Sequence, residues 1–460
     1  MKKLIVAIVV LSAIVVLAGR CKQKPDGGGL GGRQPITQCY CADSSQCDRL
    51  CSVLPTGPDM SDPKLFPNGY QATLDSVHQP PFDIFSWQAF VALNWPADSD
   101  GKPLGTPIGS APKNKRVWEY FETEYDLLGD TTGCEICQTD CDVMVARVSK
   151  GRFVVNPDGS FVEADGNALI DKNLNFAVFE VRANPTEAEY VRFVKSHLDS
   201  IDKVDFPTGS IEIKTSWRIL DTTNQLELNR YYHRRAVIYV AKENSLNNQP
   251  LCIKATLGLV GMHIAYKVAS VNHLDPWIWS TFEHIDNVPA SLEEAQMMRE
   301  RPSAYSFYNP LCVNCPPNKA PTDGKTTIKW SPTPPYAAHY ATQAPKGEGE
   351  GMDRFGTQAV REFPIYYTTQ LVNKEWQAML KNTVWANYQL VGTQWGTTPD
   401  GPPFDVVNFV PVQLANTTLE TFVQLSPMGS CGKCHGFATL VIGKDTLDAD
   451  HSFLIGNLGQ

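Results

Sequence analysis

The sequence predicts an α+β fold: a mainly β body with packed helices, followed by a short helical C-terminal segment. Segments rich in β-branched and aromatic residues fill the middle of the chain, and the 10 Trp, 16 Tyr and 20 Phe favour strand packing. Helical periodicity occurs only in isolated segments, without regular βαβ alternation or an internal repeat. The end of the chain carries short apolar stripes at helical spacing.

Length and composition are those of an ordinary folded protein. The chain has 460 residues, 42% of them hydrophobic and 19% charged, which is enough for a large core in one or two domains. Its formal charge of −9 argues against a nucleic-acid partner, which needs a basic surface.

Four regions are expected: a signal peptide or anchor at 1–20, a Gly- and Cys-rich tether at 21–60, a β-rich body at 61–410 and a C-terminal segment at 411–460.

The amino terminus predicts export. Two lysines precede the uncharged apolar run Leu4–Gly19, which has the length of a signal-peptide core and is short for a bilayer span. Ala18 offers a small-residue cleavage site. Cys21 suggests lipidation, but Arg20 stands where a lipidation signal has a small residue. We therefore expect a location in the periplasm or on the outer face of the envelope. Membrane contact would come only through an uncleaved anchor or a lipid on Cys21.

The body begins with a predicted helix that Asp83 caps and that ends before Trp95. Asn156-Pro-Asp-Gly159 is a strong turn sequence, so residues 143–165 are expected to form a hairpin. Later segments are assigned by their periodicity and residue types. The expected strands are 176–181, 211–220, 235–241, 252–268 and 384–395, and the expected helices are 185–198, 291–299 and 368–381. A capping box at Thr417–Glu420 predicts one more helix.

One short motif points to chemistry. Cys431-Gly-Lys-Cys-His435 has the spacing of covalent c-type haem attachment, in which both thiols bond the haem edge and the histidine binds iron. A shuffled chain of this composition would give about 0.007 such matches. The sequence therefore predicts one covalent haem c held by Cys431, Cys434 and His435. A surface disulfide, a zinc half-site and a thioredoxin-like pair are the competing interpretations.

The other cysteines suggest disulfides. Apart from Cys21 and the motif, ten of the 13 cysteines remain, an even number that suits an exported protein. They form clusters at 39–51, 134–141 and 312–315, with Cys252 alone. A four-cysteine metal site at 39–51, or a further cluster at 134–141, is the alternative interpretation.

The chain resembles exported single-haem proteins described only as cytochrome c family proteins. The resemblance lies in Thr256–Ile264, Trp277–Asn287, Leu414–Phe422 and the motif itself, and it spans somewhat under half of the chain. It implies that the body and the C-terminal segment act as one unit, and it implies no particular activity.

A sixth iron ligand would have to come from upstream, because no methionine follows His435. His263 lies in an apolar strand, where an imidazole needs a bond or a metal, and His284 lies in an aromatic stretch. These two are the candidate distal ligands. Weaker candidates are Met428, His233 and His339, whereas polar or turn-like contexts suggest structural roles for His78, His273 and His451.

Three functional hypotheses follow. The first is an exported cytochrome that transfers electrons to a redox partner protein. The second is a haem-dependent oxidoreductase, peroxidase- or oxygenase-like, acting on an unidentified small molecule. Glu283 with His284, or His233 with Arg234 and Arg235, would supply its acid–base groups. The third is a haem-based sensor. The sequence leaves open whether the protein is an enzyme, and it contains no phosphate loop, dinucleotide fingerprint or zinc-protease motif.

Overall fold

The computed structural model describes most of the body and the C-terminal segment. The described residues are 50–58, 74–111, 113–139, 145–146, 168–269, 274–297, 305–312, 315–320, 328–340, 355–397, 408–425, 429–456 and 458. The expected signal peptide at 1–20 and all but Val145–Ala146 of the hairpin predicted at 143–165 lie outside them. Within these ranges no helix is long and apolar enough to cross a membrane.

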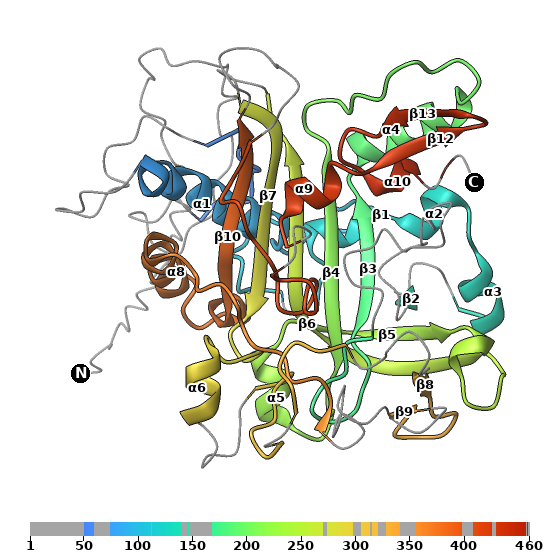
Figure 1. Ribbon diagram of the computed structural model, residues 1–460, viewed down its shortest axis with the longest axis vertical. Coiled ribbons are helices and arrows are strands. Elements are labelled where there is room, and N and C mark those ends of the chain that lie inside the picture. The colour runs from blue at the N-terminus through green and yellow to red at the C-terminus, as the bar shows by residue number, and fades with distance from the viewer. Residues whose placement is uncertain are drawn as a thin grey trace, which may run out of the picture.

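A nine-stranded, mainly antiparallel sheet organises the described residues, which confirms the α+β class with a mainly β body (Figure 1). Its main path is β1 (Glu122–Thr123), β3 (Val178–Ala183), β4 (Ile211–Ile219), β6 (Leu251–Lys267), β7 (Leu274–His284), β10 (Tyr388–Thr397) and β11 (Asn408–Val410). β5 (His233–Val240) pairs with the first half of β6, and β2 (Val145–Ala146) runs parallel to β5.

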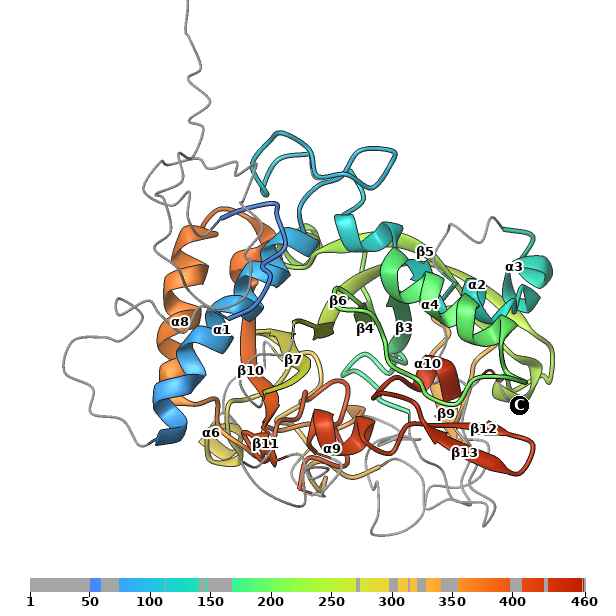
Figure 2. The ribbon, with the colours of Figure 1, turned by 90° about the horizontal axis from the view of Figure 1, so that it is seen from above.

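Two helices, α1 (Leu74–Leu93) and α8 (Tyr367–Met379), cover one face of the sheet beside β10 (Figure 2). Successive strand residues point to opposite faces, and the even-numbered residues of β7 point toward α1. Phe282 packs edge-on against Trp87, with ring centroids 5.0 Å apart, and Phe82 stacks on Trp395 at 3.8 Å. This aromatic layer belongs to the largest hydrophobic core of the described residues, and it packs against one face of the sheet.

Helix α1 corrects one sequence prediction. It begins at Leu74, so Asp83 lies inside the helix and does not cap it. The helix also contains the consecutive prolines Pro80 and Pro81. The buried Asp83 carboxylate instead accepts hydrogen bonds from Thr369 at 2.6 Å and Thr393 at 2.8 Å, which ties α1 to α8 and β10. Burial raises the pKa of Asp83 to about 6.

Most of the other sequence-predicted elements are confirmed within a few residues. Four differences stand out. Residues Val384–Asn387 form a 3-10 turn before β10, and β7 was not predicted. The capping box at Thr417 lies in a series of turns, and the C-terminal segment, expected to be helical, also contains the antiparallel pair β12 (Thr439–Ile442) and β13 (Asp445–Asp448). The remaining helices are α2 (Glu124–Leu128), α3 (Thr132–Cys137), α5 (Gln225–Arg230) and α6 (Leu292–Met297), and β8 (Ile328–Trp330) pairs with β9 (Ala338–Tyr340).

The opposite face of the sheet receives the C-terminal segment. Helix α4 (Pro185–Ser196) and the end of the chain cover it, the latter through α9 (Cys431–His435), β12 (Thr439–Ile442), β13 (Asp445–Asp448) and α10 (Phe453–Gly456) (Figures 1 and 2). The odd-numbered Trp277 and Trp279 of β7 share this second core with Leu440 and Leu454. The described residues of 411–460 therefore share a hydrophobic core with the body.

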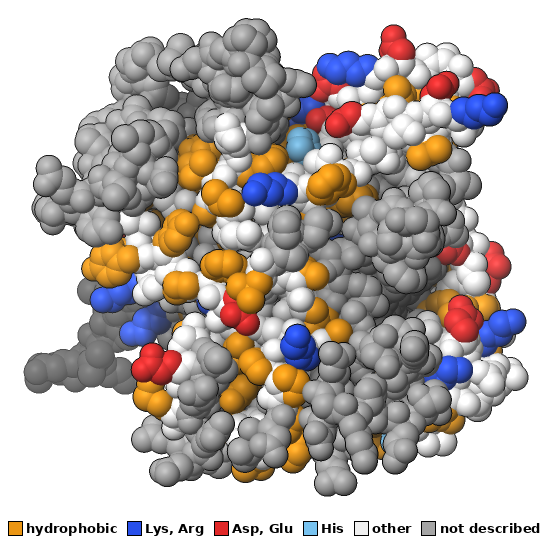
Figure 3. All heavy atoms as spheres, in the orientation of Figure 1, with side chains coloured by type: hydrophobic (Ala, Val, Ile, Leu, Met, Phe, Trp, Pro, Cys, Tyr) orange, Lys and Arg blue, Asp and Glu red, His pale blue; other side chains and the backbone are white. Residues whose placement is uncertain are grey.

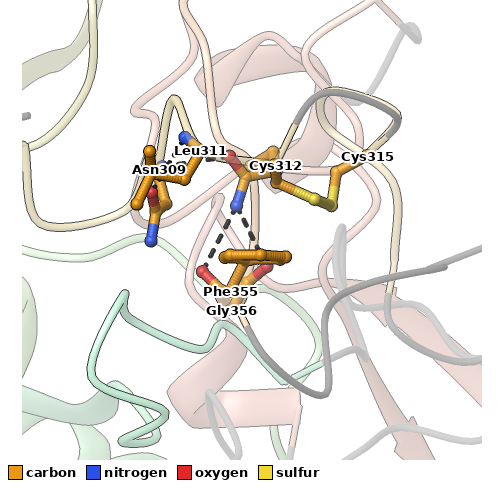
Figure 4. Close-up of a disulfide and its surroundings, with 7 residues drawn as sticks. Asn309, Leu311, Cys312, Cys315, Phe355 and Gly356 are labelled. Carbon is orange, nitrogen blue, oxygen red and sulfur yellow. Dashed lines mark hydrogen bonds between the residues drawn. A yellow bond between two sulfur atoms is a disulfide. The ribbon is translucent and has the colours of Figure 1, made fainter. Parts of the chain in front are cut away.

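The described cysteines fall into two chemical groups. One disulfide joins Cys137 of α3 to Cys252 of β6, another closes Cys312–Cys315 near the Phe355–Gly356 segment (Figure 4), and Cys51 and Cys134 are also disulfide-bonded. Among the described residues, only the two motif cysteines lie outside disulfides. No cluster of three or more potential metal ligands occurs in the described ranges, while most of the 39–51 cysteine cluster lies outside them.

Candidate haem-attachment site

Helix α9 is held on the sheet by its amino-terminal end. Ser430 caps it by accepting a hydrogen bond from the Lys433 amide. The buried Gln394 of β10 accepts from the Gly432 amide at 2.8 Å and donates to the Ser430 hydroxyl at 3.0 Å. One strand side chain thus binds both the cap and the first turn of the motif.

Gly432 allows a close approach that any other residue would block. A Cβ atom placed on Gly432 would lie 2.1 Å from Cε1 of Phe409, a separation that real Cβ atoms do not show. The helix therefore rests directly on the Phe409 ring of β11. This contact, together with Gln394, fixes where the motif lies.

The two motif thiols lie on the same short helix and are buried. The Cys431 sulfur lies 3.8 Å from the Leu414 carbonyl oxygen. Burial raises the pKa of the Cys431 thiol well above its ordinary value, and nearby Glu420 and Cys434 add to the rise. In this fold the Cys431 thiol is protonated near neutral pH and is a poor nucleophile.

His435 has its tautomer fixed by a backbone carbonyl. Its Nδ1 atom lies 2.7 Å from the carbonyl oxygen of His451, and since a carbonyl only accepts, Nδ1 carries the hydrogen. Nε2 is therefore left with its lone pair, as a metal-binding imidazole requires. Burial lowers the pKa of His435 to about 3, so the ring is neutral at physiological pH.

Aromatic rings surround His435. The ring of Phe453 lies 5.3 Å from it and that of Trp279 lies 6.4 Å away, while His451 packs edge-on against Trp279 at 5.2 Å. Two thiols outside disulfides, one neutral imidazole of defined tautomer and apolar aromatic walls make up a donor set that fits a covalently attached haem.

His263 lies on the same face of the sheet as the motif. The β6–β7 register sets it opposite Thr281, two residues from the pair Ala265 and Trp279. Its Nε2 atom is 3.1 Å from a carboxylate oxygen of Glu420, and Lys214 is its neighbour on β4. Lys214 and His263 each contribute to lowering the pKa of His435, which places them within electrostatic reach of it.

His284 lies on the opposite face, toward the α1 core. Its ring stacks on Tyr231 at 3.9 Å and packs edge-on against Tyr388. Nε2 lies 3.0 Å from the Arg230 carbonyl oxygen, and Nδ1 accepts from the Asp286 amide at 3.1 Å. Burial lowers the pKa of His284 to about 4. With both nitrogens occupied and the sheet between them, His284 is not brought to the motif.

The sequence-predicted acid–base groups are also separated. Glu283 is on the motif face, but its carboxylate is bound by Arg361 at 2.5 Å and by the Thr417 amide at 2.5 Å. His233 is exposed at the start of β5, and Arg234 forms a buried ion pair with Glu119.

Among the weaker ligand candidates, His339 is exposed on β9. Met428, His273 and the side chain of His78 lie outside the described residues.

Sequence reasoning missed His451, which acts through its backbone. Every residue has a main-chain carbonyl, so the residue type at 451 does not reveal this role. The turn-like context of His451 suggested only a structural role. Glu420 was also missed as a partner of His263. The capping-box pattern accounted for Glu420 without reference to the strand.

The stretches that carry the cytochrome resemblance meet around this site. Thr256–Ile264 and Trp277–Asn287 belong mainly to the paired strands β6 and β7. Leu414–Phe422 crosses them, with the Asn416 amide donating to the Thr281 hydroxyl at 2.9 Å. Comparison with protein-family models, curated protein sequences and solved structures finds no match, so the assignment depends on the chain's own residues.

Proposed function

We propose that this chain is an exported single-haem c-type cytochrome that transfers electrons. The observation that carries the proposal is the hydrogen bond from His435 Nδ1 to the His451 carbonyl. It gives His435 the tautomer of an iron ligand on the turn that holds Cys431 and Cys434. A bound haem c supplies one-electron redox chemistry.

Each residue of the site has a defined task in this proposal. Cys431 and Cys434 anchor the porphyrin, and His435 provides the proximal nitrogen. Gln394 and Phe409 orient the helix, while Trp279 and the neighbouring rings keep water away. Disulfides such as Cys137–Cys252 support the expected export to the periplasm or outer envelope, since such bonds persist in oxidising compartments.

The surface around α9 supports a redox partner protein. Hydrophobic, basic and acidic side chains lie over this part of the molecule (Figure 3), and Phe437, two residues after the motif, is 61% exposed. Lys433 within the motif and Val412 before it are also exposed. An apolar centre with a polar rim is the usual composition of a docking surface.

One observation favours a second candidate function, a haem-dependent oxidoreductase. Glu420 holds His263 at Nε2, the atom that most often binds iron, in a group that also contains Lys214. A histidine–carboxylate pair kept in this way can accept and return a proton as a general base. His263 is therefore proposed either as a distal acid–base group or as the sixth ligand, and in the second role it would bind iron through Nδ1 or give up its contact with Glu420.

The pyridine haemochrome spectrum of the purified protein tests the proposal. We expect a c-type band and one covalently bound haem per chain. Cyanide and carbon monoxide should leave the spectrum unchanged if the sixth position is filled, and should shift it if the position is open. A protein that matures in a cytochrome c-producing host and shows no c-type band would refute both functions.

Replacement of His263 by alanine separates the two roles of this residue. If it is a ligand, we expect the Soret band to change and carbon monoxide to bind. If it is an acid–base group, the Soret band stays and peroxidase turnover falls about 10²–10⁴-fold. His284→Ala is the control on the other face of the sheet, and it should leave the Soret band unchanged. A shift in His284→Ala alone would reverse the assignment.

A further inference from the structure

The turn that presents the His451 carbonyl is held in a strained conformation. Asp450 and His451 have φ angles of +48° and +67°, in the left-handed region that non-glycine residues rarely adopt. Such a conformation persists only where the surroundings enforce it. The side chains on either side of His451 therefore determine how its carbonyl meets His435.

Asp450 is one of these attachments. Its carboxylate accepts from Lys267 of β6 at 2.6 Å, from the Trp277 indole of β7 at 3.0 Å and from the Phe206 amide at 2.7 Å. Three donors from three segments hold Asp450 on the sheet. The negative charge of the Asp450 carboxylate is therefore compensated by Lys267.

Ser452 is the other attachment, and it leads to an unusual pair of acids. The Ser452 hydroxyl donates to Glu212 of β4 at 2.8 Å. Glu212 faces Glu187 of α4, and both side chains are buried. Among the described residues, the structure gives neither Glu187 oxygen a cationic partner.

Two neighbouring buried carboxyl groups cannot both be ionised at low cost, so the pair is expected to keep one proton. Burial raises the pKa of Glu187 well above its ordinary value, and the Glu212 charge raises it further. Burial also raises the pKa of Glu212. The first turn of α4 favours the one remaining negative charge, because helix amino-termini stabilise anions.

The other charged groups around the pair come from the strands and the turn. Lys214 of β4 lowers the pKa of Glu212, while Asp450 raises that of Glu187. Lys267 and Asp205 are already paired with each other, and Lys267 also with Asp450. Lys214 is thus the described cation that acts on the pair directly, since Lys267 is taken up by Asp205 and Asp450.

We propose that Glu187 and Glu212 form a proton-binding site which, through Ser452 and His451, makes the redox potential at His435 depend on pH. The proposal rests on the proposed function. When a reduced partner protein delivers one electron to the oxidised haem site, the pair takes up one proton from solvent, and the reverse occurs on oxidation. Net charge in this region then stays constant.

The charge of the pair determines the direction in which the midpoint potential changes with pH. Loss of the shared proton leaves two negative charges beside the turn, which disfavours an added electron. The midpoint potential should therefore fall as pH rises. Glu187 and Glu212 act through the turn, and are positioning residues.

Glu187→Gln tests the proposal, because glutamine imitates the protonated acid at all pH values. Glu189→Gln, an exposed position on the same helix, is the matched control. In spectroelectrochemical titrations between about pH 5 and 8, we expect the slope of potential against pH to fall at least threefold in Glu187→Gln and to stay at the wild-type value in Glu189→Gln. Equal slopes in both variants would overturn the proposal.

Urea unfolding of the haem-free protein gives a readout that does not need the cofactor. A carboxyl whose pKa is raised by folding contributes stability at low pH, and this stability is lost as pH rises through the raised value. The urea midpoint should thus fall with pH in the wild type and in Glu189→Gln, and clearly less in Glu187→Gln. Should Glu187→Gln not fold, Glu212→Gln replaces it in both measurements, with the same expectations.

Failure of the proposed function and failure of the proton-binding proposal give different results. Absence of a c-type haemochrome in the wild type removes the proposed function, and with it the link to redox potential. A flat urea profile in the wild type removes the shared proton even if haem is bound. Haem bound, a sloping urea profile and identical potential slopes in Glu187→Gln and Glu189→Gln would show that the pair is purely structural.

Discussion

Replacing Cys431 and Cys434 together by alanine is expected to abolish covalent haem attachment. Both thioether bonds need these sulfurs, and no other described cysteine lies outside a disulfide. The measurement is intact mass under denaturing conditions, combined with a haem stain of the denatured protein. Each single variant should keep one bond and give a haemochrome band shifted from that of the wild type.

The chain provides a matched control with the same spacing. Cys312 and Cys315 also stand three apart, but they form a disulfide and are followed by Pro316 instead of histidine. The Cys312→Ala/Cys315→Ala variant should retain haem at the wild-type stoichiometry. Loss of haem in this variant, or its retention in Cys431→Ala/Cys434→Ala, would contradict the assignment of the motif.

The sequence predicts well what depends on local pattern. β4 and β6 alternate or run in apolar, β-branched residues, and their predicted limits differ from the observed ones by one residue. The spacing of Cys431 to His435 is likewise local, because one turn of helix carries all three groups. Residue type and spacing are sufficient where the neighbours in space are also neighbours in sequence.

What the sequence could not predict depends on contacts between distant segments. Gly432 is one of two variable positions in the motif, and only the approach of Phe409 shows why it is glycine. His263 and His284 looked equivalent, since both sit in apolar stretches. The strand register places them on opposite faces, because His263 pairs with Thr281 and His284 with Tyr388.

Replacing Arg361 by methionine is expected to lower the free energy of unfolding by about 3–5 kcal/mol, because it leaves a buried carboxylate without its partner. Glu283 is fully buried and Arg361 is 5% exposed, with 2.5 Å between their closest atoms. The second oxygen of Glu283 accepts from the Thr417 amide, so the pair also fixes the segment that carries Glu420 to the sheet. Urea unfolding monitored by circular dichroism provides the measurement.

Arg192→Met is the matched control, since Arg192 pairs with Glu122 at the surface, where the two side chains are 51% and 36% exposed. Solvent screens that pair, and its loss should cost at most about 1 kcal/mol. Adding Glu283→Leu to Arg361→Met should recover part of the loss, because the uncompensated charge is then removed as well. Equal destabilisation by Arg361→Met and Arg192→Met would show that the buried Glu283–Arg361 pair contributes no more to stability than a surface pair. The segment that brings Glu420 to His263 would then need another anchor.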